Sequence, residues 1–258
     1  MKVKFLYPIL GITLLGLMTT CDDIPFDDDQ YGDVCNVVKV EILNTETTTL
    51  EYDQYDMLTE ISTFGSNIPT TRMVVVYNNN TAFADFYLNG QFYGSAEAPI
   101  DENGNLLSCI WTDSTGVDVA EETFFYDAEG HLIQVNGTNY FTGSSESLFI
   151  EWTNGNPTKF LRTLGPTIAC EYFTGQFSSL RMGQGNVVLL FQEVDANVAM
   201  MFSQDLLKVY DREGIIIGEP MYLEYEIDSD GKARILYWST ESNGNFGTTN
   251  IDYDCHGN

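Results

Sequence analysis

Apolar and polar residues alternate along several segments that follow residue 35, and this alternation predicts β-strands. A strand points successive side chains to opposite faces, so the apolar residues of a half-buried strand recur at every second position. Strands with one apolar and one polar face are typical of antiparallel sheets that have water on one side. The apolar faces are Val38, Val40 and Ile42 in one segment, Leu148, Ile150 and Trp152 in a second, and Met221, Leu223, Tyr225 and Ile227 in a third; the opposite faces are Lys39 and Glu41, Ser147 and Glu151, and Tyr222, Glu224 and Glu226.

A short motif recurs between such segments: an apolar or aromatic residue, Asp, two further residues, Gly, one residue and an apolar position. Its four clearest copies read IDENGNLL, YDAEGHLI, YDREGIII and IDSDGKARI. Asp at the first turn position accepts hydrogen bonds from nearby backbone N–H groups, and Gly accepts the left-handed backbone where the next strand begins. The motif therefore predicts β-hairpin turns at Asp101–Gly104, Asp127–Gly130, Asp211–Gly214 and Asp228–Gly231.

A fifth copy, in EYDQYDMLTEI, aligns Asp53 with the first turn position and Asp56 with the glycine, and Asp tolerates the left-handed conformation. Two Asn-Gly pairs, at 89–90 and 154–155, predict further hairpins. The chain is therefore expected to be all-β, a long antiparallel β-meander of hairpins that forms a strongly curved or rolled sheet, with at most one or two short helices. One such helix is predicted to begin at Asp195. Its apolar stripe would be Val198, Met201, Phe202 and Leu206.

From about Cys35 to its end, the chain resembles the YD-repeat-like lipoproteins of Bacteroidota, a domain family of unknown function. The recurring Y-D-x-x-G-x-L motifs, the segment WTNGNPTKF and the segment MMFSQDLLKVYDREG carry this resemblance. The resemblance implies a long antiparallel meander that is rolled around an apolar face. Since the shared motifs specify turns, it implies almost nothing about activity.

The N-terminus resembles a bacterial lipoprotein signal. Lysines at positions 2 and 4 precede an apolar stretch at 5–18, whose helical length of roughly 21 Å is short of a hydrocarbon core of about 30 Å. Cys21 follows this stretch directly and is predicted to be the acylated first residue of the mature chain. Asp22 and Asp23 resemble the surface-export signal of lipoproteins in Bacteroidota-type envelopes.

These features divide the chain into a signal peptide at 1–20, an acidic flexible tether at 21–34 and a single β-rich domain at 35–258. The membrane is expected as a partner through the N-terminal lipid anchor. The predicted location is the outer membrane, with the domain exposed at the cell surface.

The charge of the chain excludes one class of partner. There are 38 acidic and 11 basic residues among 258, which gives a formal net charge of −27. A surface this negative repels phosphate backbones, so we expect no nucleic-acid partner.

Four cysteines remain after Cys21, an even number in a chain predicted to be exported, and they allow three disulfide connectivities. Cys35 opens the β-rich domain and Cys255 nearly closes it, so a bridge between them would tie the two ends of the sheet. Cys109 and Cys170 lie within apolar, strand-like runs, where a buried free thiol is the ordinary alternative. All four residues are disulfide candidates.

Little in the chain indicates catalysis or metal binding. His131 occupies the slot that Asn105, Ile215 and Lys232 hold in the other turn motifs, so we expect a solvent-facing strand start there rather than a catalytic residue. A calcium-binding EF-hand loop needs glycine at its sixth position, whereas the turn motif has glycine at its fourth. The chain has two histidines and no Cys-x-x-Cys pair, so its sequence does not indicate a zinc site. Neither a G-x-S-x-G elbow nor a phosphate-binding glycine loop occurs. We therefore expect no enzyme, no metal site and no cofactor.

The first predicted function is a non-enzymatic binding or interaction module at the cell surface, with a glycan or a protein as its partner. Aromatic residues exposed on a rigid sheet face would favour it. The alternative is a periplasm-facing lipid or lipoprotein handler, which a ligand-sized apolar cavity in a concave sheet would favour. A structural scaffold is the third prediction. The aromatic candidates for the binding face are Tyr87, Phe92, Tyr93, Tyr172, Phe173, Tyr237 and Trp238.

Overall fold

The computed structural model describes residues 35–43, 45–54, 57–66, 68–78, 80–102, 105–177, 205–213, 220–240 and 247–255. The predicted signal peptide and tether lie outside these residues. So do Asp56, Gly104 and Gly214 of the predicted turns, and the helix predicted to begin at Asp195, except that Leu206 belongs to a strand.

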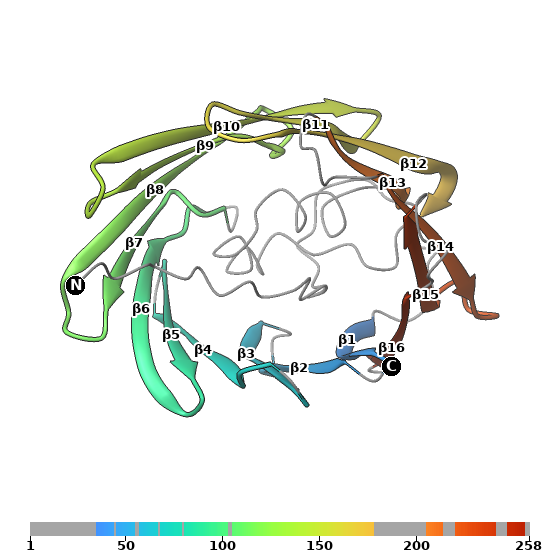
Figure 1. The fold of residues 1–258 in the computed structure, drawn as a ribbon, viewed down its shortest axis with the longest axis horizontal. Helices are drawn as coiled ribbons and strands as arrows, with labels where there is room; N and C mark the ends of the chain where they lie inside the picture. Colours follow the sequence, from blue (N-terminus) through green and yellow to red (C-terminus); the bar gives the residue numbers. More distant parts are fainter. Residues whose placement is uncertain are drawn as a thin grey trace.

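The described residues form sixteen antiparallel strands, and each strand pairs with the next one along the chain. The first strand also pairs with the last, so the sheet closes into a barrel (Figure 1). The prediction of an all-β, rolled antiparallel meander is confirmed. The strands are β1 (Cys35–Ile42), β2 (Glu46–Tyr52), β3 (Leu58–Gly65), β4 (Thr71–Asn78), β5 (Thr81–Leu88), β6 (Gln91–Pro99), β7 (Ser108–Asp113), β8 (Asp118–Tyr126), β9 (Leu132–Asn139), β10 (Ser144–Thr153), β11 (Asn156–Arg162), β12 (Thr167–Phe177), β13 (Asp205–Glu213), β14 (Met221–Ile227), β15 (Ala233–Thr240) and β16 (Gly247–Cys255).

The described residues contain no helix, and hence none with the length and apolar character needed to cross a membrane.

The apolar side of the alternating strands faces the inside of the barrel. Curvature crowds side chains on the concave face and spreads them apart on the convex face, so the positions with almost no exposure mark the concave side. In β10, Leu148 and Ile150 are 4% and 5% exposed, whereas Phe149 between them is 42% exposed. Leu148 pairs with Val135 of β9, which pairs with Phe124 of β8, and all three are buried. The inner face is therefore continuous from strand to strand.

One β-bulge shifts a predicted face. In β1 the register shifts between Val37 and Lys39, so Val37 and Val40 are the buried residues, and Val38 is only half-buried. In β14 Leu223 is buried as predicted, whereas Ile227, the last residue of the strand, is 43% exposed; the bulge beside it lies in β15, where Arg234 is the extra residue. A bulge adds an unpaired residue and reverses the alternation beyond it, which the sequence pattern did not indicate.

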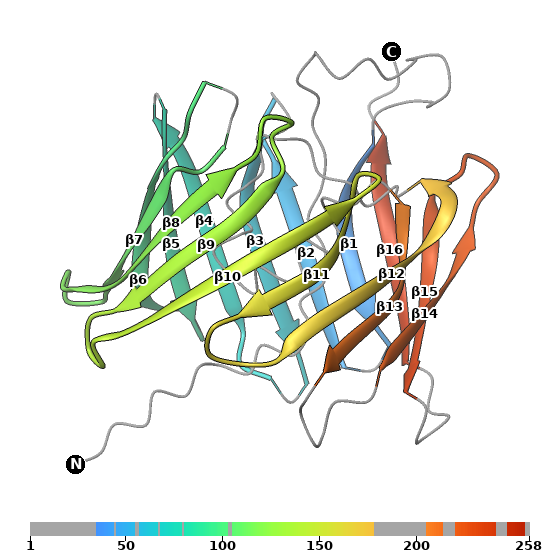
Figure 2. The same ribbon diagram turned by 90° about the horizontal axis from the view of Figure 1, so that it is seen from above.

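Because consecutive strands run in opposite directions, successive connections alternate between the two ends of the barrel (Figure 2). β1 begins and β16 ends at one end, which we call the N-terminal rim. The turns β2–β3, β6–β7, β8–β9, β10–β11 and β14–β15 lie at this rim, and the turns β5–β6 and β7–β8 lie at the other end, the distal rim. Tilted strands of about eight residues separate the rims by about 20 Å.

Four strands each carry an inward aromatic side chain that forms a hydrogen bond with the backbone of the strand before it. Each of these aromatic side chains donates a hydrogen bond to a backbone carbonyl, so its body packs in the wall while its polar atom is satisfied. The donors and carbonyls are Tyr52 and Val37 (3.0 Å), Trp152 and Leu132 (2.9 Å), Tyr172 and Pro157 (2.8 Å), and Tyr253 and Ala233 (2.9 Å).

Candidate functional site

The Asp-x-x-Gly turns share one local geometry, which is centred on the aspartate. In the turn from β8 to β9, Oδ1 of Asp127 accepts hydrogen bonds from the backbone N–H groups of Glu129 (2.9 Å) and His131 (2.8 Å). Gly130 has a φ of +83°, which side chains with a Cβ rarely adopt. The other turn aspartates accept the same bond from the residue four positions later: Asp53 from Met57, Asp101 from Asn105, Asp113 from Val117 and Asp228 from Lys232.

The Asp113 turn at the distal rim was not among the predicted turns. Its sequence DSTG has the same spacing as the other copies, and Gly116 has a φ of +83°. The spacing of Asp and Gly alone was therefore a sufficient signal.

The turn predicted at Asp211–Gly214 is wrong at its first position. Asp211 lies inside β13 and pairs with Ala169 of β12. On the other side of β13, Tyr210 pairs with Met221, so the connection to β14 is longer than a four-residue turn. Pairing with β12 continues the strand through Asp211, and this long-range pairing overrides the local turn preference.

His131 occupies a structural slot in its turn. Its Nδ1 lies 3.0 Å from Oδ2 of Asp127, the oxygen that the backbone N–H groups leave free. Burial raises the pKa of Asp127, but the hydrogen bonds from His131 and Glu129 outweigh this effect and hold the pKa below its usual value. In two other turns an amide or a guanidinium donates to the corresponding oxygen of the aspartate. These donors are Nδ2 of Asn105 to Asp101 (3.1 Å) and Nε of Arg234 to Asp228 (2.6 Å).

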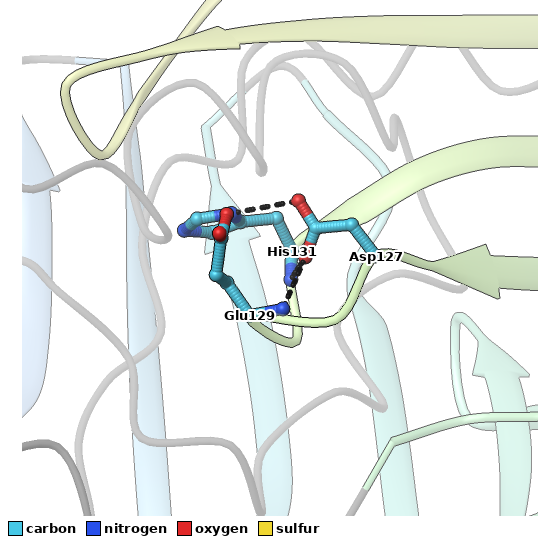
Figure 3. Close-up of side chains that lie close together, drawn as sticks. All are labelled: Asp127, Glu129 and His131. Carbon is cyan, nitrogen blue, oxygen red and sulfur yellow. Dashed lines mark hydrogen bonds and ion pairs between the residues drawn. The ribbon is translucent and has the colours of Figure 1, made fainter.

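Asp127, Glu129 and His131 gather their side chains at the N-terminal rim (Figure 3). Oε2 of Glu129 lies 3.7 Å from Nδ1 of His131, and ligand atoms of the three residues lie within 4.8 Å of one another. The His131 ring stacks on Trp152, with ring centroids 4.4 Å apart and an interplanar angle of 18°. A hollow of about 290 Å³ opens beside the cluster, and Asn154 of the β10–β11 turn lines its other side.

A larger cavity of about 680 Å³ lies beside the β1–β16 seam at the N-terminal rim. Its lining includes the carboxylates of Glu51, Asp53 and Asp254. The smaller hollow is lined by Asp127 and Glu129. Both cavities are therefore acidic, whereas a lipid handler requires an apolar one.

Exposed aromatic residues gather at the distal rim, next to the β5–β6 turn. Phe92 and Tyr93 are 42% and 49% exposed. The ring of Phe92 meets the ring of Tyr87 edge to face at 5.9 Å, and the Arg72 guanidinium lies 5.8 Å from the centre of the Tyr87 ring. Arg72 is held by Glu60, with an N–O distance of 2.5 Å. We call Tyr87, Phe92 and Tyr93 the aromatic face.

The other four aromatic candidates do not form an exposed cluster. Tyr172 and Phe173 pack against the core inside the barrel. Tyr237 is half-buried and its hydroxyl donates to Glu226. Trp238 is also half-buried. Period-two alternation shows which residues share a face, but it does not show which face is inward.

The cysteines separate into two kinds. Cys109 and Cys170 are buried thiols. Burial raises the pKa of Cys109 well above its usual value, which disfavours thiolate chemistry there. The register of the closing strands places Cys35 directly opposite Cys255.

The carboxylate of Glu122 lies on the inner face of the wall. Glu122 pairs with Cys109 on one side and with Gly137 on the other. Its Oε2 accepts a hydrogen bond from Nε1 of Trp111 at 3.2 Å. Burial raises the pKa of Glu122, and neither the bond from Trp111 nor the charge of Arg162 cancels this effect. The folded barrel therefore disfavours the charged form of Glu122.

Glu122→Gln is expected to reduce the loss of stability that the protein suffers as the pH rises. A carboxyl whose pKa is raised by folding stabilises the fold below its unfolded pKa, and this contribution is lost as the pH rises through the folded pKa. Glutamine keeps an acceptor for Trp111 and carries no charge. Urea unfolding at about pH 5 and about pH 8 checks this, with the exposed Glu97→Gln as the control. If the unfolding free energy falls by the same amount from the lower to the higher pH in the parent and in Glu122→Gln, the raised pKa of Glu122 is contradicted.

Comparison with known proteins supports the architecture. No protein-family model matches the chain, and no curated protein shows significant similarity to it. A porin-like protein from Bacteroides uniformis superposes with a TM-score of 0.61 at 14% sequence identity, over 87% of this chain and 99% of that chain. A porin-like protein from Bacteroides vulgatus matches with a TM-score of 0.38 at 10% identity, over 84% and 98% of the two chains. The first match shows a shared fold, while the resemblance to YD-repeat-like lipoproteins stays a prediction.

Proposed function

We propose that the protein is a non-enzymatic, lipid-anchored protein of the cell envelope, and that its barrel stands outside the lipid bilayer and binds a glycan at its outer surface. The observation that carries this proposal is the distribution of charge on the barrel wall. Charged side chains are exposed on the outward face in strands all around the barrel. They are Glu51, Arg72, Asp85, Glu97, Glu121, Glu151, Glu171, Lys208, Glu224, Glu226 and Asp252.

A channel that spans the outer membrane is the second candidate, because the solved neighbours are described as porin-like. Membrane-spanning barrels carry an outward apolar band about 25 Å tall and a polar lumen. The wall of this protein differs, since its inner face is apolar. Its outer face mixes exposed apolar residues, such as Phe83 and Phe149, with charged residues. Of the latter, Asp85, Glu171 and Glu224 are exposed near the middles of their strands. Outward charges at the centre of a bilayer are costly, at about 2–4 kcal/mol for each Arg or Lys and less for Asp or Glu. The charge pattern favours a barrel in water.

The start of β1 and the aromatic face lie at opposite ends of the barrel. A lipid on Cys21 would be joined by the predicted tether to β1, which begins at the N-terminal rim. The aromatic face stands at the distal rim, about 20 Å farther from the anchored end. An anchored barrel can therefore present Phe92 and Tyr93 away from the membrane.

The chemistry of the aromatic face suits a sugar ring. Tyr and Phe offer flat apolar surfaces to the C–H groups of a sugar, and they are held on a rigid hairpin. Arg72, which lies beside the Tyr87 ring, and Glu60, which pairs with Arg72, supply donors and acceptors for hydroxyl groups. Neither described cavity offers an apolar site for a lipid, so the glycan reading is preferred to the lipid handler.

Replacing both exposed aromatic residues, in Phe92→Ala/Tyr93→Ala, is expected to lower glycan binding by at least about tenfold, because these rings supply most of the contact area. A glycan array followed by titration of the best ligand measures the effect. Phe125→Ala is the matched control, since Phe125 has the same 42% exposure as Phe92 but lies at the end of β8 near the N-terminal rim. Equal binding by the parent and the double variant would remove the aromatic face as the site.

A further inference from the structure

We propose that Asp127, Glu129 and His131 form a binding site for a divalent transition-metal ion of the zinc type. In the part of the chain that the structure describes, they are the one group of three such residues whose ligand atoms come together. The site lies at the N-terminal rim, remote from the aromatic face, and it does not depend on the glycan proposal.

Two of the separations between donor atoms are close to those that a single ion would impose. Nδ1 of His131 lies 3.0 Å from Oδ2 of Asp127 and 3.7 Å from Oε2 of Glu129. Zinc bonds of about 2.0–2.2 Å place neighbouring ligands of a tetrahedral ion roughly 3.3 Å apart. These two distances bracket this value, and the ligand atoms of all three residues lie within 4.8 Å of one another. The Glu129 side chain is 78% exposed, so it can move inward by a few tenths of an ångström without repacking the wall.

Metal binding leaves the turn intact. Oδ1 of Asp127 accepts the backbone N–H groups of the turn, and Oδ2 is the oxygen that faces His131. The stack on Trp152 holds the imidazole plane in place, as supporting residues do around metal ligands. The adjoining hollow of about 290 Å³ has room for water molecules as further ligands, and Thr153 and Asn154 line it with polar groups.

The Asp228 turn provides an internal comparison. It has the same backbone hydrogen bonds, and Asp230 holds the position of Glu129. In that turn a cation is built into the chain, because Nε of Arg234 lies 2.6 Å from Oδ2 of Asp228. In the Asp127 turn the corresponding oxygen faces an imidazole instead. A bound ion would supply there the positive charge that Arg234 supplies in the other turn.

The ligand set selects the class of ion. An imidazole nitrogen together with two carboxylates suits zinc and its neighbours in the first transition series, whereas magnesium and calcium prefer sites made of oxygen alone. The net charge of −27 also raises the concentration of cations near the surface.

Zinc titration of the full chain in detergent, with accessible thiols alkylated beforehand, tests the site by calorimetry. Cobalt substitution then reports the ligands through its visible absorption. The variants are His131→Asn and Glu129→Gln. Asparagine occupies the same slot in the Asp101 turn, where Asn105 bonds to the aspartate, so the turn is expected to fold in His131→Asn. Asp230→Asn in the Asp228 turn is the control for non-specific binding to acidic turns.

The parent is expected to bind about one ion at this site, His131→Asn to weaken binding by at least about tenfold, and Asp230→Asn to bind as the parent does. Glu129→Gln is expected to weaken binding by a smaller factor. Equal zinc affinity in the parent and in His131→Asn, with unchanged circular dichroism in both, would show that His131 only stabilises the turn. An absence of saturable binding in the parent would overturn the proposal as well.

Discussion

The chain from Asp22 to Asn258, exported behind a cleavable signal and therefore without lipid, is expected to stay in aqueous solution without detergent. The reason is the outward face of the wall, where exposed charges such as Asp85 and Glu171 favour water over hydrocarbon. The full lipidated chain, by contrast, is expected to sediment with membranes and to require detergent for release. Nearly all of the lipid-free protein should remain in the aqueous fraction, and nearly all of the lipidated chain should be found in the membrane fraction.

Ultracentrifugation followed by size-exclusion chromatography measures this shift, and circular dichroism verifies that the lipid-free protein is folded and rich in β-structure. The lipidated chain serves as the control. A lipid-free barrel that folds only when detergent micelles or vesicles are added would show that the wall itself belongs in the membrane.

A disulfide between Cys35 and Cys255 is expected to supply the largest single contribution to the stability of the barrel. The two residues are direct partners in the β1–β16 register. Direct partners in an antiparallel pair have Cα atoms about 4.5–5.5 Å apart, within the range of about 4.4–6.8 Å that a disulfide requires. The bridge would close a loop of about 220 residues, for which chain entropy gives up to about 5 kcal/mol of unfolding free energy.

Peptide mapping under non-reducing conditions detects the bridge, and denaturant unfolding with and without reductant measures its contribution. The parent should lose stability on reduction, and Cys35→Ser should remove this dependence. Cys109→Ala, which replaces a buried thiol, should leave the dependence on reductant unchanged. Unbridged Cys35 and Cys255 in the exported protein would contradict the prediction.

Local features of the barrel could be read from the sequence because they depend on a few neighbouring residues. Asp127 and Gly130 specify a hairpin through one carboxylate and one left-handed backbone. The alternation of Leu148 and Ile150 with polar or exposed neighbours gave the correct face of β10. In these cases the signal and the structure it specifies span fewer than ten residues.

Long-range features could not be read in this way. The pairing of β1 with β16 joins residues at the two ends of the domain, and its one signal in the sequence was the cysteine at each end, Cys35 and Cys255, which left three disulfide connectivities open. The position of Asp211 also depends on a distant segment. Its turn motif predicts a loop, but Asp211 pairs with Ala169 of β12. His131 was correctly placed after a turn, but its stacking on Trp152 depends on the neighbouring hairpin and gave no local signal.

The most direct test of the account is labelling of the outer wall on intact cells with a membrane-impermeant maleimide. Asp85→Cys in β5 and Glu171→Cys in β12 place thiols at exposed, outward positions in the middle of two strands, and the parent chain provides the background. A barrel that stands outside the bilayer at the cell surface predicts labelling of both variants on intact cells. Labelling that appears only after the outer membrane is permeabilised would place the barrel in the periplasm. Labelling that appears only after the membrane is dissolved in detergent would contradict the central claim, because it would place the wall in lipid.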